Sequence, residues 1–330
     1  MPHRASALVV ALSLLAAVPA GAAAPADPSP YATLAAIEAR VAAIGFRLTT
    51  ANAALCPVQQ PQFGWIWGDP RLYDADRRAE ALAVYGAATR DAPFVAAIAP
   101  SSPAAAVGLR VGAAVTGIQG SAVPDGADAH PFARITAIET WLATMPPTAP
   151  LALDAGDVGP LTLTPVAGCV SDFRVEASEK AGAVADGRMV LVNQGLAQFA
   201  ADDDELAAAI AHELAHNVLR HRARLDAAGV DRGLGKQFGR SARLFKQTEI
   251  EADRLSVWLL AGAGYDPAAA ARFWTRFGQR KGRPLIQAGT HPPWRDRVAS
   301  LEAEAALIAA ARTAGQPLRP PLIDAPPPLE

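Results

Sequence analysis

The pentapeptide His212-Glu213-Leu214-Ala215-His216 constrains this chain more than any other feature of its sequence. It lies in a segment with the apolar spacing of a long helix, and Asp202 with Glu205 forms a capping box at its start. The helix is expected over residues 203–222 and somewhat beyond. Two histidines four residues apart share one helix face, so their imidazoles can bind one tetrahedral Zn²⁺. Glu213 can reach a water on such a metal.

A zinc site that performs chemistry needs a third protein ligand and an open fourth position. In one class of these sites, the third ligand is a histidine six residues after the second, with a glycine between them. Here Arg222 occupies the place of that histidine, Leu219 occupies the place of the glycine, and His221 is one residue short. This class is therefore excluded, and His221 is expected to point elsewhere on the helix.

The other class takes a carboxylate from a following helix, which is expected over residues 246–261. The candidates are Glu249, Glu251 and Asp253. Glu249 and Asp253 are four residues apart and share a helix face, whereas Glu251 lies about 160° from Asp253 and should face away. We therefore assign Glu249 as the third ligand and Asp253 as the residue that fixes the tautomer of a ligand histidine. The alternative is a solvated acidic helix face.

Length and composition limit the number of domains and the classes of function that the chain can have. The 330 residues suggest two domains with additional segments, and a hydrophobic content of 51% is enough for a sizeable core. The formal net charge is −2 and no long basic run occurs. Nucleic-acid binding therefore gains no support from the sequence.

Residues 1–22 have the pattern of a signal peptide. His3 and Arg4 precede an apolar run from Ala5 to Val18, and small residues follow it. The run is too short to span a membrane comfortably, so we expect export with cleavage rather than a membrane anchor.

The two cysteines, Cys56 and Cys169, are expected to pair in an exported protein, because oxidising compartments favour disulfides. The bond would tie the N-terminal segment to the start of the last domain. The alternative is two free thiols.

The region before Cys169 is expected to have two parts. Residues 23–83 form an N-terminal helical segment, with a loop at residues 59–70. Residues 84–168 are β-rich: Phe94–Ile98 is a strand candidate, and residues 151–163 have the pattern of a hairpin. Between them, Ser102-Pro103 begins a short helix.

This order of elements, with Gly108-Leu109, Gly112 and the Ile118-Gln119-Gly120 turn, resembles a PDZ domain of the bacterial protease-associated kind. Ala113 stands where such domains usually carry an aspartate. The resemblance implies peptide binding by strand addition at a sheet edge. The alternative is a PDZ-shaped spacer without a ligand.

Residues 170–305 carry motifs in the order that one family shows. These motifs are His212–His216, Glu249–Asp253, Gly264–Pro267 and Thr290-His291-Pro292. The segment resembles the gluzincin family that includes HtpX-like, BepA-like and CAAX-prenyl-endopeptidase metallopeptidases. The resemblance implies a compact helical zincin domain with a small sheet, and it places Val190–Val192 beside the cleft, where a substrate backbone pairs.

The same resemblance gives His291 a role near the zinc, as a fourth ligand or a gate. The alternative is a loop histidine that caps local structure. Arg297, six residues later, matches an arginine of the family and is expected to be structural.

The expected fold class is α+β. A mainly helical zincin-type metallopeptidase domain with a small sheet occupies residues 169–312, after the β-rich PDZ-like domain. Residues 313–330 are Pro-rich and are expected to be a disordered tail.

The expected function is that of an exported zinc-dependent endopeptidase that holds one Zn²⁺ and uses Glu213 as the catalytic base. The resemblance implies a bacterial periplasmic protein that acts in envelope protein quality control on polypeptide substrates such as misfolded envelope proteins. One alternative is a latent or inactive protease acting as a chaperone-like PDZ binding protein, and another is a PDZ adaptor with a structural zinc. The basic stretch from Arg220 to Lys246 is either a solvated face or a peripheral membrane contact.

Overall fold

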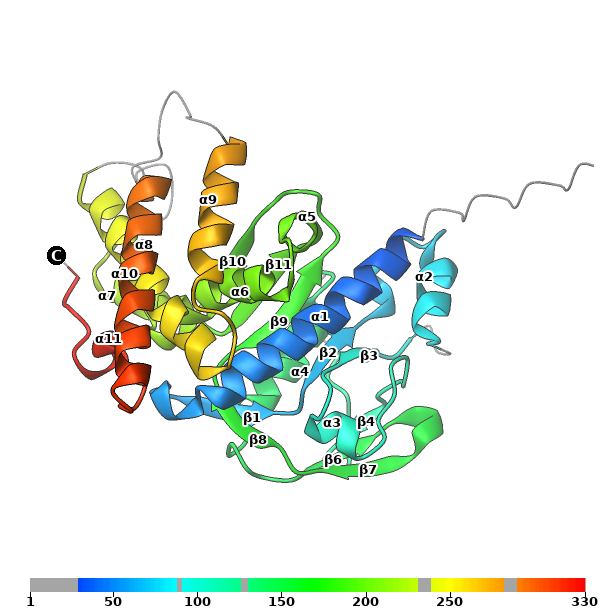
Figure 1. Cartoon of the computed structure of the whole chain (residues 1–330). Coiled ribbons are helices and arrows are strands. Elements are labelled where there is room, and N and C mark those ends of the chain that lie inside the picture. The colour runs from blue at the N-terminus through cyan, green and yellow to red at the C-terminus, as the bar shows by residue number, and fades with distance from the viewer. Residues whose placement is uncertain (1–28, 88–90, 126–129, 231–238, 282–289, 330) are drawn as a thin grey trace, which may run out of the picture.

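The computed structural model describes residues 29–87, 91–125, 130–230, 239–281 and 290–329 (Figure 1). The expected signal peptide at residues 1–22 lies outside the described residues, as do Arg232 and Lys236 of the basic stretch. Among the helices of the described residues, none is both long and apolar enough to cross a lipid bilayer.

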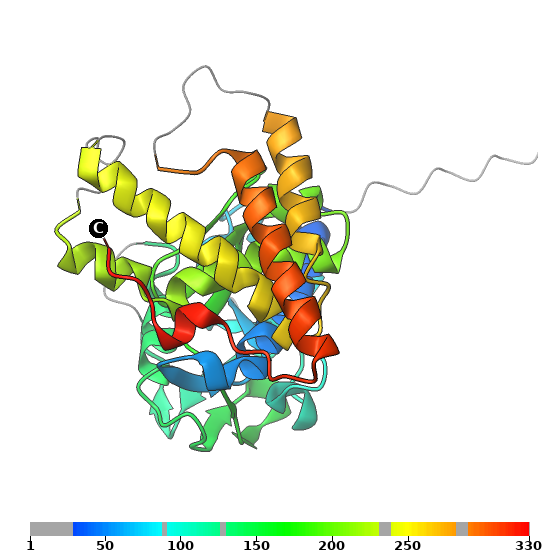
Figure 2. The ribbon, with the colours of Figure 1, turned by 60° about the vertical axis from the view of Figure 1, so that its left-hand side comes forward.

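The C-terminal half is built on two helices that pack closely, α6 (Asp203–Val218) and α8 (Gly239–Gly262). The side chain of Asp202 caps α6 by accepting a hydrogen bond from the backbone N–H of Glu205 at 2.8 Å, as expected. Most of α6 is buried, and Figures 1 and 2 show it enclosed by neighbouring helices and the sheet. Besides α8, these neighbours include α1 (Pro30–Ala51) and α9 (Ala269–Lys281), and α10 (Trp294–Thr313) packs on α8 and α9.

The expected continuation of α6 beyond residue 222 is wrong. The helix ends at Val218, Arg220 adopts a left-handed conformation with φ of 54°, and α7 (His221–Ala227) begins in a new direction. Neither glycine nor proline marks this break, so propensity alone does not reveal it.

A small sheet lies beside α6, with the strand order β10 (Ala183–Ala185), β11 (Met189–Asn193), β9 (Asp172–Glu176). β9 and β11 are parallel, β10 and β11 are antiparallel, and α5 (Gln194–Phe199) follows β11. The edge strands of this sheet are therefore β10 and β9, whereas β11, which contains Val190–Val192, is paired on both sides.

A second, β-rich unit has its own core. Its elements are β2 (Trp65–Gly68), β3 (Phe94–Ile98), α3 (Pro103–Ala106), β4 (Gly117–Ile118), β5 (Ser121–Ala122), α4 (Ala133–Leu142), β6 (Leu151–Asp154) and β7 (Pro160–Leu163). The expected strand at residues 94–98 and the hairpin formed by β6 and β7 are present, and Ser102 caps α3. The core also contains Phe63 and Trp67, which lie before the expected start of this unit at residue 84.

The segment at residues 59–70 is not the expected loop. β1 (Gln59–Gln62) pairs with β8 (Val166–Cys169), and β2 pairs with β3. The remaining short elements are η1 (Ala53–Leu55), η2 (Pro70–Leu72), α2 (Arg78–Tyr85) and η3 (Gly156–Val158). Because β1 and β8 are about one hundred residues apart in sequence, their pairing leaves no local signature.

Buried ion pairs join the two cores. Glu139 of α4 pairs with Arg174 of β9 and with Arg188, which precedes β11. A second pair, Arg134 with Asp69 at 2.6 Å, lies inside the β-rich side, and both of these side chains are almost fully buried. A buried charge whose partner is lost is costly, so the Glu139 contacts favour one fixed arrangement of the β-rich unit against the sheet.

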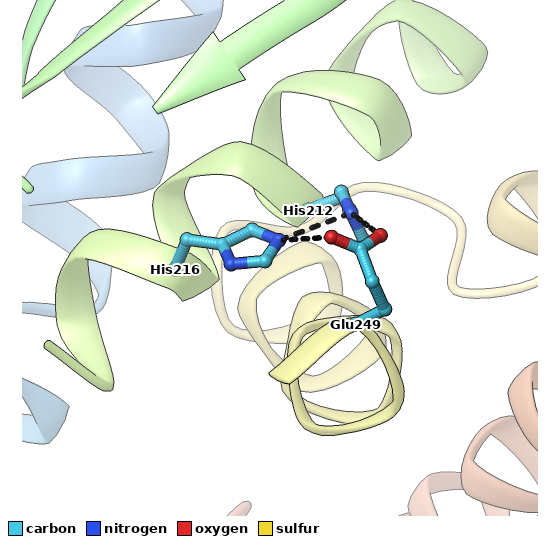
Figure 3. Close-up of side chains that lie close together, drawn as sticks. All are labelled: His212, His216 and Glu249. Carbon is cyan, nitrogen blue, oxygen red and sulfur yellow. Dashed lines mark hydrogen bonds and ion pairs between the residues drawn. The ribbon is translucent and has the colours of Figure 1, made fainter. Parts of the chain in front are cut away.

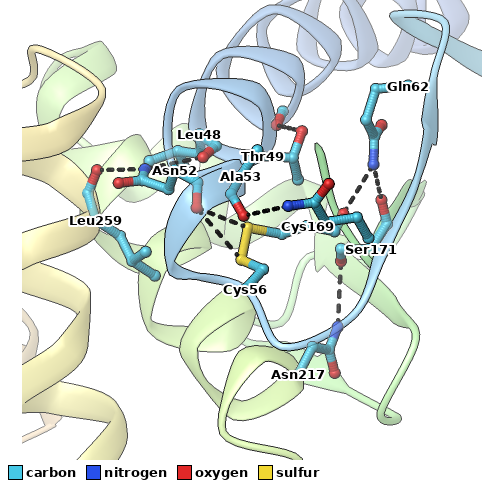
Figure 4. The surroundings of a disulfide bond; sticks show 12 residues. Leu48, Thr49, Asn52, Ala53, Cys56, Gln62, Cys169, Ser171, Asn217 and Leu259 are labelled. Atoms are coloured by element: carbon cyan, nitrogen blue, oxygen red, sulfur yellow. Dashed lines mark hydrogen bonds between the residues drawn. A yellow bond between two sulfur atoms is a disulfide. The ribbon is translucent and has the colours of Figure 1, made fainter. Parts of the chain in front are cut away.

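Cys56 and Cys169 form the expected disulfide, with their Cα atoms 5.3 Å apart (Figure 4). It joins the chain just after η1 to the end of β8. Nearby, the Asn52 side chain donates hydrogen bonds to the carbonyl oxygens of Leu48 and Leu259, each at 2.9 Å. The end of α1 is thus fixed both to β8 and to α8.

The composition suggested that the whole C-terminal tail is disordered, but part of it is ordered. It contains α11 (Pro321–Asp324), and Leu322 is buried in the main core. Figure 2 shows the segment that follows running past α1 toward α7 and α8. There Arg224 and Gln247 donate hydrogen bonds to the carbonyl oxygens of Pro327 and Pro328 at 2.7 and 2.8 Å.

Reduction of the disulfide should lower the stability of the folded protein. The two cysteines are 113 residues apart, and closing a loop of that length constrains the unfolded chain by up to about 4.7 kcal/mol in the chain-entropy description. Urea unfolding with and without a reductant measures the effect. A Cys56→Ser/Cys169→Ser double variant is the control. The midpoint of its urea unfolding should match that of the reduced protein and should not change when the reductant is added. Equal midpoints for the oxidised and reduced protein would contradict the expectation.

Candidate metal site

Three side chains from α6 and α8 converge on one point (Figure 3). The Nε2 atoms of His212 and His216 are 3.3 Å apart. Oε2 of Glu249 lies 3.4 Å from Nε2 of His212, and Oε1 of Glu249 lies 3.5 Å from Nε2 of His216. The sequence prediction named these three residues, and the packing of α6 on α8 brings them together.

The triangle of donor atoms has the size that one zinc ion requires. With ligand distances of about 2.0–2.1 Å and tetrahedral angles, neighbouring donors are about 3.3–3.4 Å apart. The two Nε2 atoms are 3.3 Å apart, and each lies 3.4–3.5 Å from one of the two carboxylate oxygens of Glu249, which is close to this value. Two imidazole nitrogens and one carboxylate are three ligands of a four-coordinate zinc ion and leave the fourth position open. This donor set is typical of catalytic rather than structural zinc sites.

The charges around the triangle also suit a cation. Burial lowers the pKa of His216 to about 3, so its ring is neutral and can act as a ligand. Burial opposes a charge on His212 as well, but hydrogen bonds to Asp253 and Glu249 outweigh it and raise the pKa to about 10. For Glu249, burial alone would raise the pKa, yet the neighbouring imidazoles hold it well below its usual range. Glu249 is therefore an anion.

Asp253 lies where the helix periodicity placed it, beside a histidine of the triangle. Its Oδ1 is 3.0 Å from Nδ1 of His212. Arg297 holds the same carboxylate with two hydrogen bonds of 2.6 and 2.7 Å, and its guanidinium stacks on the ring of Trp274 at 3.4 Å. Asp253 thus directs Nε2 of His212 toward the triangle, and Arg297 from α10 holds Asp253 in place.

Glu213 projects from α6 into a cavity of about 660 Å³. Burial raises the pKa of its carboxyl to about 7, while a backbone hydrogen bond with Ala185 of β10 acts in the opposite direction. A pKa near neutrality suits a group that must accept and then return a proton.

The cavity is lined by the edge strand β10 and by aromatic side chains. β10 forms part of its wall, and Val184 on that strand is 57% exposed. Phe273, Trp274 and Phe277 of α9 also line it. The edge strand that faces the cavity is therefore β10, not the expected Val190–Val192 strand.

His291 lies at the periphery of the triangle. Its Nε2 is 3.6 Å from Oε2 of Glu249, its side chain is 54% exposed, and its Nδ1 is 2.9 Å from the hydroxyl oxygen of Thr290. It approaches the carboxylate from the open side, while the compact triangle itself is formed by the other three residues.

Sequence reasoning missed one contact of the site. His221 was expected to point elsewhere, but the break after α6 turns it back so that its Nδ1 is 2.9 Å from Nδ1 of His216. Glu251, expected to face away, points away from the triangle, yet it is buried and lies 3.1 Å from Nε2 of His221. A histidine five residues after His216 was visible in the sequence, but the turn that directs it was not.

A His-Glu-x-x-His helix packed against a helix that supplies a carboxylate as the third ligand, with an edge strand in the wall of the cavity, is the arrangement of a metallopeptidase. Residues 174–235 and 234–305 match the sequence profile of Peptidase family M48. This is the segment on which the family resemblance was based.

The chain is also similar to the mitochondrial metalloendopeptidase OMA1 of Schizosaccharomyces pombe. The two are 31% identical over 140 residues, which cover 36% of this chain and 42% of that protein. The chain thus spans less than half the length of this relative. Both comparisons support a metalloprotease region of the M48 type.

Zinc should stabilise the protein, and Glu249→Ala should abolish this effect. At free zinc of about 100 times the dissociation constant, mass action adds about 2.7 kcal/mol to the free energy of unfolding. Unfolding of chelator-treated protein, followed with and without added zinc, measures this increment. Glu302→Ala, which removes an exposed carboxylate from α10, is the control and should respond like the wild type. An undiminished increment in Glu249→Ala would show that the metal binds elsewhere.

Proposed function

We propose that this protein is a zinc-dependent endopeptidase in which His212, His216 and Glu249 hold a single Zn²⁺. The observation that carries the proposal is the cluster of His212, His216 and Glu249 beside Glu213, in the lining of a cavity to which the edge strand β10 contributes. The similarity to M48 peptidases over residues 174–305 supports it independently.

Each residue has a distinct task in peptide hydrolysis. A bound zinc ion supplies a Lewis acid that polarises a carbonyl and lowers the pKa of water. Glu213 accepts the proton of the attacking water and delivers it to the leaving amine. β10 offers the unpaired edge of its backbone to an extended peptide, which would lie across the cavity as an added strand. The aromatic side chains of α9 in the lining favour an apolar substrate residue.

The finer assignment within the proposal is an HtpX- or BepA-like peptidase of the bacterial periplasm that removes misfolded envelope proteins. The disulfide supports an oxidising compartment, because such bonds are rare in reducing ones. The β-rich unit, proposed as a PDZ-like domain, would hold polypeptide clients. Exposed Arg220, Arg240, Arg243 and Lys246 support a peripheral contact with anionic lipid.

The competing proposal is a latent or inactive protease that binds clients through the PDZ-like unit. It differs from the first in its response to a chelator. Client binding that survives metal removal, without any cleavage of casein by the zinc-loaded protein, would favour it. Cleavage of casein that a chelator stops and zinc restores would favour the endopeptidase.

Glu213→Gln should keep zinc but lose cleavage. The amide has nearly the same shape as the carboxyl group and cannot accept the proton, so the rate should fall by about 10²–10⁴-fold. Casein hydrolysis measures the rate, and the zinc content of the same preparation shows that the site remains loaded. Glu302→Gln on α10 is the control. Undiminished hydrolysis by Glu213→Gln would refute the role of Glu213.

A further inference from the structure

The Nδ1 atoms of His212 and His216 have different hydrogen-bonding partners. His212 contacts a carboxylate directly, through Nδ1 and Asp253 at 3.0 Å. His216 contacts a second histidine, with its Nδ1 at 2.9 Å from Nδ1 of His221. The rings of His216 and His221 meet edge to face, with centroids 4.8 Å apart.

The protons of this pair can be assigned from the geometry. Nε2 of His216 is a corner of the donor triangle, so this nitrogen must be free to bind a metal and the proton of the neutral ring must be on Nδ1. Nδ1 of His216 then donates to Nδ1 of His221. The proton of His221 is consequently on Nε2, where it donates to Oε2 of Glu251 at 3.1 Å. The opposite assignment would put a proton on the nitrogen of His216 that faces the metal position.

Glu251 is itself held firmly. Its side chain is buried, and Arg224 donates to its Oε2 at 2.5 Å. Gln247, one turn earlier on α8, donates to its Oε1 at 2.9 Å. Since Arg224 and Gln247 also hold the carbonyl oxygens of the C-terminal tail, the carboxylate has a fixed position behind His221.

We propose that His221 is a positioning residue for the metal site, which together with Glu251 fixes the tautomer and ring orientation of His216. In metal sites, such support is usually a single acceptor directly behind the ligand histidine. Here the acceptor behind His216 is a neutral imidazole, and the carboxylate stands one ring further back. The inference rests on the metal site of the proposed function but not on peptide hydrolysis, so metal binding tests it.

The test is the zinc dissociation constant of the full chain, measured by competition with a chromophoric chelator. His221→Phe removes both hydrogen bonds and should weaken zinc binding by about 10–100-fold. His221→Asn places its side-chain oxygen near the position of Nδ1, keeps an acceptor for His216 and should recover most of the affinity. His221→Gln extends past that position toward Glu251 and should bind as weakly as the phenylalanine variant. His130→Asn, at an exposed position, is the control and should leave the affinity unchanged.

Thermal unfolding of the metal-free variants separates positioning from packing. A residue that only fills space would lower the stability of the metal-free protein and leave the zinc affinity of the folded protein unchanged, and this result would overturn the proposal. Equal loss of affinity in the asparagine and phenylalanine variants would overturn it as well. If phenylalanine at residue 221 prevents folding, the comparison of the asparagine and glutamine variants decides the question.

His212→Ala distinguishes failure of this inference from failure of the metal site. If His212→Ala abolishes zinc binding while His221→Phe and His221→Gln bind like the wild type, the positioning role is wrong and the site stands. If His212→Ala binds zinc like the wild type, the site itself is wrong and the inference falls with the proposed function.

Discussion

The close packing of α6 against α8 is the constraint on which the site depends. The donor atoms of His212, His216 and Glu249 reach one another only because two helix backbones approach closely along their buried faces. Both helices bury small residues, such as Ala208, Ala211 and Ala252, which is consistent with close packing. Dense packing transmits any displacement of one helix to the donor triangle, so the surrounding core fixes the geometry of the site.

The carboxylates around the site differ in whether an arginine is paired with them. Asp253 is paired with Arg297, Glu251 with Arg224, and Glu304 with Arg254. Glu249 instead faces three imidazoles, those of His212, His216 and His291, at 3.4–3.6 Å. No arginine is paired with Glu249 in the ion pairs of the described residues, and a bound metal ion would take the place of the proton that His212 holds in the metal-free site. The arginines keep the neighbouring carboxylates from competing for the metal.

The sequence predicted best what depends on local periodicity. Spacing of four residues identified His212 with His216 and Glu249 with Asp253, and the structure brings each pair to one face of its helix. The N-caps at Asp202 and Ser102 were visible for the same reason. Features that depend on distant contacts were not visible. The pairing of β1 with β8 joins residues far apart in the chain, and burial of Leu322 orders part of a tail whose composition alone suggested disorder. The break at Arg220 lies between these cases: it is local, but no glycine or proline marks it.

In the proposed function, the site must hold a metal and also keep the pKa of the general base Glu213 near neutrality. A carboxylate behind a ligand histidine strengthens that ligand, but each further anion near Glu213 raises its pKa, as Glu249 already does. Asp253 can lie directly behind His212 because Arg297 neutralises it. Behind His216, the imidazole of His221 separates Glu251 from the site, and Coulomb interactions weaken with distance. Both carboxylates are also paired with an arginine, Asp253 with Arg297 and Glu251 with Arg224, so neither is an unbalanced anion near Glu213.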